Sequence, residues 1–273
     1  MKAFKYVLVY LLLIQLVLPY AVPFDLIFKD RMDYNLAKDN LESIDVILER
    51  ISRQIQDENL HDYIIILGYS IAFSGPGNAS QSIGHYMQEL ADQSVPEQPV
   101  RIYNLSVPAM QSGDIYTMLL KLDQHQISTQ NLIVNVDYKG FVLRQPGPAI
   151  VFWLPEDLQS LDPATYQHMQ TNWPVPKPTP PSIQAQVHRL LWNHVQMFRY
   201  SGFIKKGLIN VMRTMIGAAP VDDALGDARP WFEKEGLVQV LQQPEYKQEF
   251  SDHMHLTAVG NRELTRILWD NFK

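Results

Sequence analysis

A short apolar run, IIIL at residues 64–67, ends abruptly in a glycine, a tyrosine and a serine. Such a run, bounded by turn residues, is typical of a strand buried on both faces, and the parallel sheets of α/β proteins require strands of this kind. Ligands and catalytic groups gather at the carboxyl edge of open α/β sheets, so Ser70, on the turn after Gly68, is a candidate nucleophile. Serine is also common in turns and at helix N-caps, which is the competing explanation.

The neighbouring segments alternate between helical and strand patterns. Apolar residues recur at helical spacing in residues 40–56, 80–93 and 112–125, with Ser112 placed to cap the last of these helices. Residues 102–107 and 131–136 have strand patterns, and residues 256–272 predict a final helix. Strands that alternate with helices predict an α/β fold with a parallel sheet and right-handed crossovers.

A proline-rich segment interrupts this alternation. Residues 141–182 contain nine prolines and end in WPVPKPTPPS, which cannot form a long helix or a central strand. We interpret the segment as an insertion or lid, after which helical patterns resume at about residue 183.

The composition excludes several classes of protein. A chain of 273 residues that is 46% hydrophobic can form a sizeable core. A formal net charge of -6 gives no broad cationic surface, which disfavours a nucleic-acid partner. The chain contains no cysteine, so it has neither disulfides, a thiolate nucleophile nor a cysteine zinc site.

The amino terminus carries a membrane signal. Lys2 and Lys5 precede a segment without charged residues from Tyr6 to Phe24, close to the ~20 residues that span a bilayer. We expect an uncleaved transmembrane anchor that leaves the lysines in the cytoplasm and the rest of the chain outside it, in the periplasm if the source is bacterial. Cleavage after Ala21 is the alternative. The predicted organisation is therefore an anchor at 1–29, a helical linker at 30–60 and an α/β domain at 61–273.

An acidic residue and a histidine precede the final helix in the segment SDHMHLTAVG. Asp252 and His255 are three residues apart, a spacing that places two side chains on one face of a helical turn. A serine nucleophile needs a base, and the base needs a partner that fixes its tautomer. His253 and His255 lack the accompanying carboxylate cluster of a metal site, so we expect no metal.

Gly68-Tyr69-Ser70 and the DHMHL segment resemble the first and last sequence blocks of the SGNH, or GDSL-like, hydrolase family. The resemblance extends from about Ile64 to Trp269 and implies a three-layer α/β/α, flavodoxin-like domain. It also implies a catalytic triad of Ser70, His255 and Asp252. Tyr69 departs from the aspartate that commonly precedes the family's serine.

The middle blocks of the family are matched more weakly. NLSVPAMQSGD resembles the second block, with Ser106 where the family has an oxyanion-binding glycine and Ala109 at the next usual glycine. IVNVDYKG resembles the third block, with Asp137 in place of the oxyanion-binding asparagine. An ionised carboxylate there would repel the oxyanion, whereas a protonated one could donate a hydrogen bond. Asn135, two residues earlier on the same strand face, is the alternative.

The resemblance implies an activity and its partners. Anchored members of this family often remove acyl groups from cell-envelope or secreted polysaccharides, or transfer them from a membrane donor protein. We therefore expect a cofactor-independent serine esterase or acyltransferase acting on an acylated glycan. The alternative is a non-catalytic glycan-binding or scaffold protein that has lost its oxyanion hole, which the replacements at Tyr69, Ser106, Ala109 and Asp137 favour.

Overall fold

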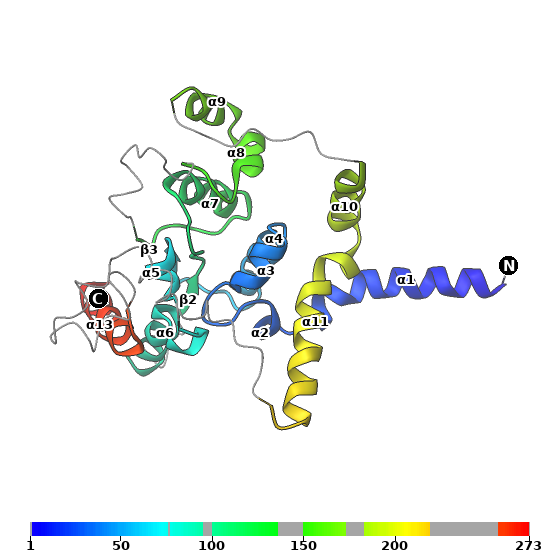
Figure 1. Ribbon diagram of the computed structural model, residues 1–273. Helices are drawn as coiled ribbons and strands as arrows, with labels where there is room; N and C mark the ends of the chain where they lie inside the picture. Colours follow the sequence, from blue (N-terminus) through cyan, green and yellow to red (C-terminus); the bar gives the residue numbers. More distant parts are fainter. Residues whose placement is uncertain are drawn as a thin grey trace. The chain divides into compact units, whose positions relative to one another are not determined.

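The computed structural model describes residues 2–75, 77–94, 100–135, 150–172, 183–218 and 256–272 (Figure 1). The chain divides into two compact units, each assembled from segments that are distant in sequence. Unit 1 comprises Met1–Lys29, Asn35–Arg50 and Thr179–Asp222, and unit 2 comprises Asp30–Tyr34, Ile51–Pro178 and Asp223–Lys273. Helix α3 (Tyr34–Asp39) and helix α4 (Ser43–Asp57) each contribute residues to both units.

Unit 2 contains a parallel three-stranded sheet. Its strands are β1 (Tyr63–Leu67), β2 (Arg101–Asn104) and β3 (Leu132–Val134), in the order β2-β1-β3. The central strand β1 is buried along its whole length, as the apolar run predicts, because both of its faces are covered. This confirms the expected mixed α/β fold with a parallel sheet.

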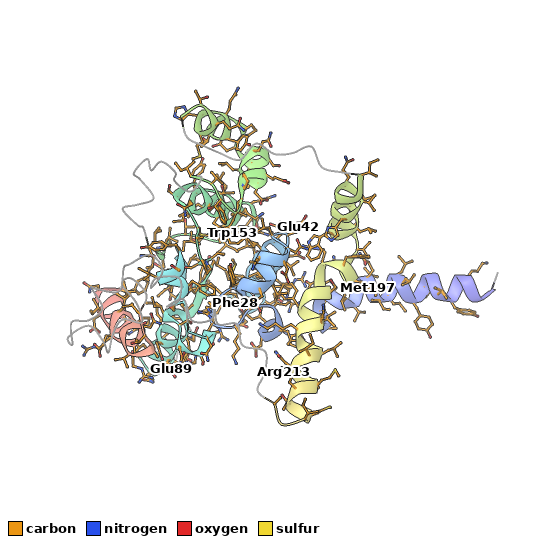
Figure 2. The ribbon with its side chains drawn as sticks, in the orientation of Figure 1. Phe28, Glu42, Glu89, Trp153, Met197 and Arg213 are labelled. Carbon is orange, nitrogen blue, oxygen red and sulfur yellow. The ribbon has the colours of Figure 1, made fainter. Side chains whose placement is uncertain are left out.

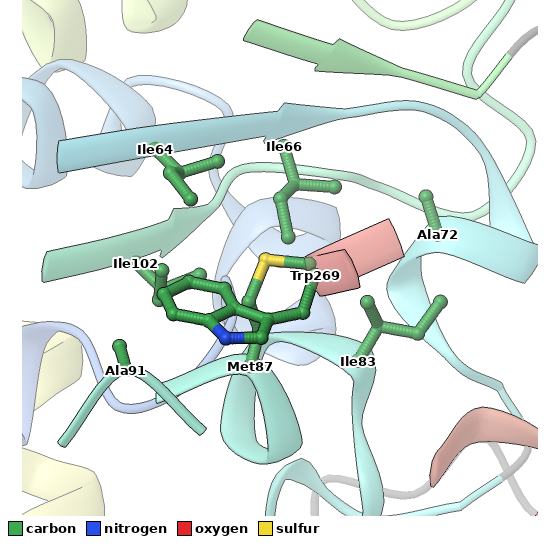
Figure 3. Packing of buried hydrophobic residues seen from close by; sticks show 8 residues of the cluster. All are labelled: Ile64, Ile66, Ala72, Ile83, Met87, Ala91, Ile102 and Trp269. Carbon is green, nitrogen blue, oxygen red and sulfur yellow. The ribbon is translucent and has the colours of Figure 1, made fainter. Parts of the chain in front are cut away.

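One face of the sheet is covered by two helices that are far apart in the sequence. Helix α6 (Ile83–Ser94) contacts β2, and helix α13 (Ala258–Phe272) contacts α6. Trp269 inserts its indole among the side chains of both helices and the sheet (Figure 3). The buried members of this cluster are Ile64, Ile66, Ala72, Ile83, Met87, Ala91, Ile102 and Trp269.

The other side chains of β1, at Tyr63, Ile65 and Leu67, are also buried, on the opposite face, because successive residues of a strand alternate in direction. The hydroxyl of Tyr103 in β2 donates a hydrogen bond to Gln54 Oε1 of α4, at 3.1 Å. Burial of Tyr103 raises the pKa of its phenol well above the ordinary value.

A buried carboxylate joins helix α7 (Ser112–Gln124) to the segment at 150–154. Asp114 Oδ1 accepts hydrogen bonds from the backbone N–H groups of Trp153 and Leu154, at 2.8 and 2.9 Å, and Phe152 N–H lies 3.0 to 3.1 Å from both oxygens. Asp114 Oδ2 also accepts from the N–H of Gln111, at 2.9 Å. Gln111, and not Ser112 as expected, is therefore the N-cap of α7.

Two short helices belong to the proline-rich segment, α8 (Pro155–Leu161) and α9 (Pro163–Asn172). Each begins at a proline, which suits the first turn of a helix because its missing N–H would have no partner there. Lys121 of α7 forms an ion pair with Asp157 of α8, with 2.9 Å between Nζ and Oδ1. The described part of the segment, residues 150–172, thus contains two helices of seven and ten residues, and the WPVPKPTPPS stretch lies outside the described residues.

Unit 1 is helical in its described residues, with α1 (Lys2–Ala21), α2 (Phe24–Ile27), α10 (Ile183–His194) and α11 (Gln196–Met215). Arg50 donates to the carbonyls of Pro19 and Val22, which lack helical partners at the end of α1. Among the helices that the structure describes, none is both long and apolar enough to cross a membrane, so the expected transmembrane helix has no support from this criterion.

Candidate active site

Ser70 lies at the carboxyl edge of the sheet. It is the first residue of the short helix α5 (Ser70–Phe73), whose N-cap is Tyr69, and it follows β1 after only two residues. The side chain of Ser70 is half-buried. The nucleophile predicted from sequence therefore stands where ligand-binding groups of parallel α/β proteins gather.

The chain around Gly68 is packed too closely for any side chain. A Cβ at this position would lie 2.7 Å from Asn135 Cβ and 2.9 Å from Ala72 Cβ, well inside contact distance. The N–H of Asn135 donates to the carbonyl of Leu67, at 2.8 Å, which continues the pairing of β1 with β3. Asn135 is thus held against the turn that carries Ser70.

Ser106 lies on the other side of the same turn. The loop after β2 continues the parallel pairing, since the N–H of Val107 donates to the carbonyl of Gly68, at 3.1 Å. Ser106 is completely buried, and its N–H donates to Asn104 Oδ1, at 3.1 Å. The amide that the family resemblance assigns to the oxyanion therefore already has a partner.

Asn104 links this loop to the helix that begins at Ser70. Besides accepting from Ser106, its side chain donates from Nδ2 to the carbonyl of Ala72 in α5, at 2.7 Å. Asn104 is the last residue of β2 and has no solvent exposure. Sequence reasoning missed this residue, although an asparagine that ends a buried strand is a usable signal because buried amides need partners.

Arg31 holds the other end of α5. Its guanidinium donates to the carbonyls of Phe73 and Gly77, both at 2.7 Å, and to that of Ser74, at 3.3 Å. The guanidinium carbon also lies 3.9 Å from the centre of the Phe73 ring. Arg31 is 2% exposed, so a buried cation fixes the turn that follows the candidate nucleophile.

Aromatic residues from three segments meet beside this turn. The ring of Tyr34 lies edge-on to both Phe73 and Trp153, with centroids 6.3 and 6.2 Å apart. The indole N–H of Trp153 donates to the carbonyl of Pro108, at 2.8 Å. Trp153 thus packs against the loop that contains Ser106.

Two buried polar atoms flank the Gly68 turn without a hydrogen-bond partner among the described residues, namely Ser106 Oγ and Asn135 Oδ1. A serine hydroxyl can donate or accept a hydrogen bond and an amide oxygen can accept one, so both atoms retain hydrogen-bonding capacity beside Ser70.

The other predicted site residues lie outside the described residues. These are Asp137, Asp252 and His255, together with His253. The structure therefore brings Ser70, Ser106 and Asn135 to one sheet edge. Within the described part of the chain, no group of three or more acidic, histidine or cysteine side chains is arranged to hold a metal ion.

In comparisons with known proteins, no family model, curated protein or solved structure matches the chain.

Proposed function

We propose that this protein is an SGNH-like serine esterase or O-acyltransferase, with a three-layer, flavodoxin-like α/β/α domain. One observation carries the proposal: Ser70 follows the central strand of a parallel sheet, with Ser106 and Asn135 on either side of the preceding turn. The strand order β2-β1-β3 is that of the first three strands of a flavodoxin-like sheet. Ligands of such sheets bind where the strand order reverses, which is beside β1.

In this proposal Ser70 Oγ attacks the carbonyl carbon of an ester while His255 accepts the hydroxyl proton and Asp252 orients the imidazole. The tetrahedral intermediate collapses when His255 returns the proton to the departing alcohol, which leaves an acyl-serine. His255 then takes a proton from water in hydrolysis, or from a sugar hydroxyl in transfer, as the oxygen of that group attacks the acyl carbon. The bond from this carbon to Ser70 Oγ breaks and His255 returns the proton to Oγ, which releases the carboxylic acid or the acylated sugar and regenerates the serine.

The oxyanion would be held by the N–H groups of Ser70 and Ser106 and by a side chain from the end of β3, either Asp137 or Asn135. The Ser106 N–H would have to exchange its bond to Asn104 Oδ1 for one to the oxyanion. Asn135 has the amide that the family uses at this position, and its side chain is anchored against Gly68.

A second candidate function rests on that same Ser106 bond. If Asn104 keeps the N–H, the oxyanion site lacks a donor, and the fold would serve as a non-catalytic glycan-binding or scaffold protein. The two functions differ in the reactivity of Ser70.

A fluorophosphonate probe tests this difference, because only an activated serine displaces its fluoride. The full-length protein should be labelled, and Ser70→Ala should abolish both labelling and turnover of p-nitrophenyl acetate, since loss of a triad serine costs about 10⁶-fold in rate. Ser80→Ala is the matched control, because Ser80 is exposed and bonds only locally, to Asn78. An unlabelled wild-type protein would favour the scaffold function, and a labelled Ser70→Ala protein would place the nucleophile elsewhere.

We further propose that α1 anchors the protein in the cytoplasmic membrane with the catalytic domain outside the cytoplasm, near acylated polysaccharide and a membrane acyl donor. The support is the exposure of apolar side chains along α1, including Leu11, Leu12, Leu16 and Val17. The full-length protein should resist carbonate extraction from membranes. Mature protein that begins after Ala21 and is free of the membrane would contradict the anchor.

A further inference from the structure

Helix α11 of unit 1 has one face packed inside the unit. Tyr200, Phe203 and Gly207, at helical spacing, are buried. A Cβ at Gly207 would lie 3.2 Å from both methyl groups of Leu26, so α11 passes closely over α2 at this point. The other faces of α11 carry its exposed apolar side chains and its basic side chains.

A second face of α11 is apolar and exposed. With 100° between successive residues, Met197, Leu208 and Met215 fall on one line along the helix, and Val211 and Met212 lie within about 60° of it. Leu208 is 60%, Met212 66% and Met215 81% exposed. Burial of side chains of this size would be favourable, so their exposure to water is costly. Figure 2 shows Met197 near the start of the helix and its side chains projecting along the whole length.

The third face of α11 is basic. Arg199, Lys206 and Arg213 are seven residues apart and so follow one line, with Lys205 near the apolar face. Arg199 forms an ion pair with Glu49 of α4, with 2.7 Å between Nη2 and Oε2, so its charge is used inside the unit. Helix α11 contains no acidic residue, although the whole chain has a net charge of -6. A helix that pairs an apolar face with a basic one is typical of segments that lie on membranes.

Helix α11 is also joined to α1. Gln15 of α1 donates to the carbonyl of His194 and accepts from the N–H of Gln196, at 2.9 Å, across the break between α10 and α11 at Val195. Non-helical backbone at a membrane needs such internal partners, because lipid offers none. The exposed apolar side chains of α1 and those of α11 thus belong to one unit.

We propose that α11 lies in the headgroup region of a bilayer that contains anionic lipid, with its apolar face toward the acyl chains and with Lys206 and Arg213 among the lipid phosphates. A second copy of the chain would bring two basic lines together, whereas anionic headgroups complement them. This contact is independent of any catalytic activity, and it adds a second membrane contact to the anchor proposed for α1.

The absence of cysteine from the chain allows a direct test with spin labels. Met212→Cys places a label on the apolar face, and the control Asn210→Cys places one on nearly the opposite side, only two residues away. The full-length protein is reconstituted into vesicles of phosphatidylcholine with phosphatidylglycerol. The label at 212 should be more accessible to oxygen than to a water-soluble nickel complex, at a depth of ~5–10 Å. The label at 210 should show the reverse.

A second part of the experiment tests whether binding of α11 to the vesicles depends on its basic residues. Lys206→Gln and Arg213→Gln are combined in the Met212→Cys background. The equilibrium constant for binding of α11 to the anionic surface should fall about 25-fold, because each basic residue near such a surface contributes a factor of about five. A label at 212 that remains accessible to the nickel complex with the native lysine and arginine would overturn the proposal. So would dipolar broadening between labels in detergent without lipid, which would identify a second copy as the partner. A label at Leu12→Cys reports separately on the membrane anchor proposed for α1, and esterase assays report on Ser70. Failure of the anchor or of the esterase proposal can therefore be told apart from failure of the proposal for α11.

Discussion

Replacement of Asp114 by asparagine should loosen the segment at 150–154 from helix α7. The carboxylate is completely buried and accepts from four backbone N–H groups, three of them in a segment almost forty residues further along the chain. Asparagine has the same shape but replaces one acceptor oxygen by an NH₂ donor. If the donor takes the place of Oδ2, it faces the N–H groups of Gln111 and Phe152.

The magnitude follows from those bonds. A hydrogen bond to a charged group contributes about 1.5–3 kcal/mol, and Asp114→Asn removes the Gln111 bond outright while weakening the others. Burial raises the pKa of Asp114, with the backbone N–H groups of Gln111, Phe152, Leu154 and Trp153 acting in the opposite direction. The neutral amide escapes this desolvation, so we expect a net loss of ~1–3 kcal/mol in unfolding free energy. Asp114→Ala leaves all four N–H groups without the carboxylate and should cost ~3–5 kcal/mol.

Urea unfolding and amide hydrogen exchange measure the two consequences. With an m-value of ~1–3 kcal/mol/M, Asp114→Asn should lower the unfolding midpoint by about 1 M. Exchange should accelerate at the amides of Gln111, Phe152, Trp153 and Leu154 before it does in β1, because the opening is local. Asp123→Asn, on the exposed side of the same helix, should change neither quantity. Unchanged protection of the four amides in Asp114→Ala would refute the role assigned to this carboxylate.

Three further outcomes are expected. Gly68→Ala should destabilise or unfold unit 2, since its Cβ would overlap Asn135 and Ala72, and a soluble variant with an unchanged melting temperature would contradict the close approach. Asn104→Ala should cost ~2–4 kcal/mol, because it leaves the carbonyl of Ala72 and the N–H of Ser106 without their partner. In the same thermal melt Asn78→Ala should cost much less, because the half-buried Asn78 side chain accepts from the hydroxyl of the exposed Ser80, which water can replace. If the protein is an esterase with Asp137 in its oxyanion site, Asp137→Asn should preserve or raise esterase activity. The gain should be largest at higher pH, where the native carboxyl would ionise and repel the oxyanion. A large loss of activity across the pH-rate profile of Asp137→Asn would show that the residue has another role.

Much of the fold of unit 2 could be predicted because its signals are local. The apolar run at 64–67 requires burial on both faces, and the alternating patterns around it determine a parallel sheet. The same logic places Ser70 and Ser106 at one edge, since the carboxyl ends of parallel strands coincide. The cap of α7 was predicted one residue late, because the choice of Gln111 depends on its bond to Asp114 and not on intrinsic cap preference.

The contacts that hold the site in place could not be predicted. Arg31 reaches carbonyls more than forty residues away, and Asn104 reaches Ala72 over 32 residues. Periodicity reports only on neighbours within one or two helical turns, so it carries no information about such pairs. Asp137, Asp252 and His255 stay predictions, because they lie outside the described residues.

The position of Trp269 has a consequence for biosynthesis. This side chain fills the core beside Met87, yet roughly 180 residues separate the two, and at 5–20 residues per second a ribosome needs about 10 to 40 s to cover that distance. During that interval the side chains of Ile64, Ile66 and Met87 lack the contact with Trp269 that helps to bury them in the folded protein. We therefore expect the nascent chain to be exposed to aggregation, or to capture by chaperones, during this interval, and we expect a product that stops before α13 to aggregate or to be degraded.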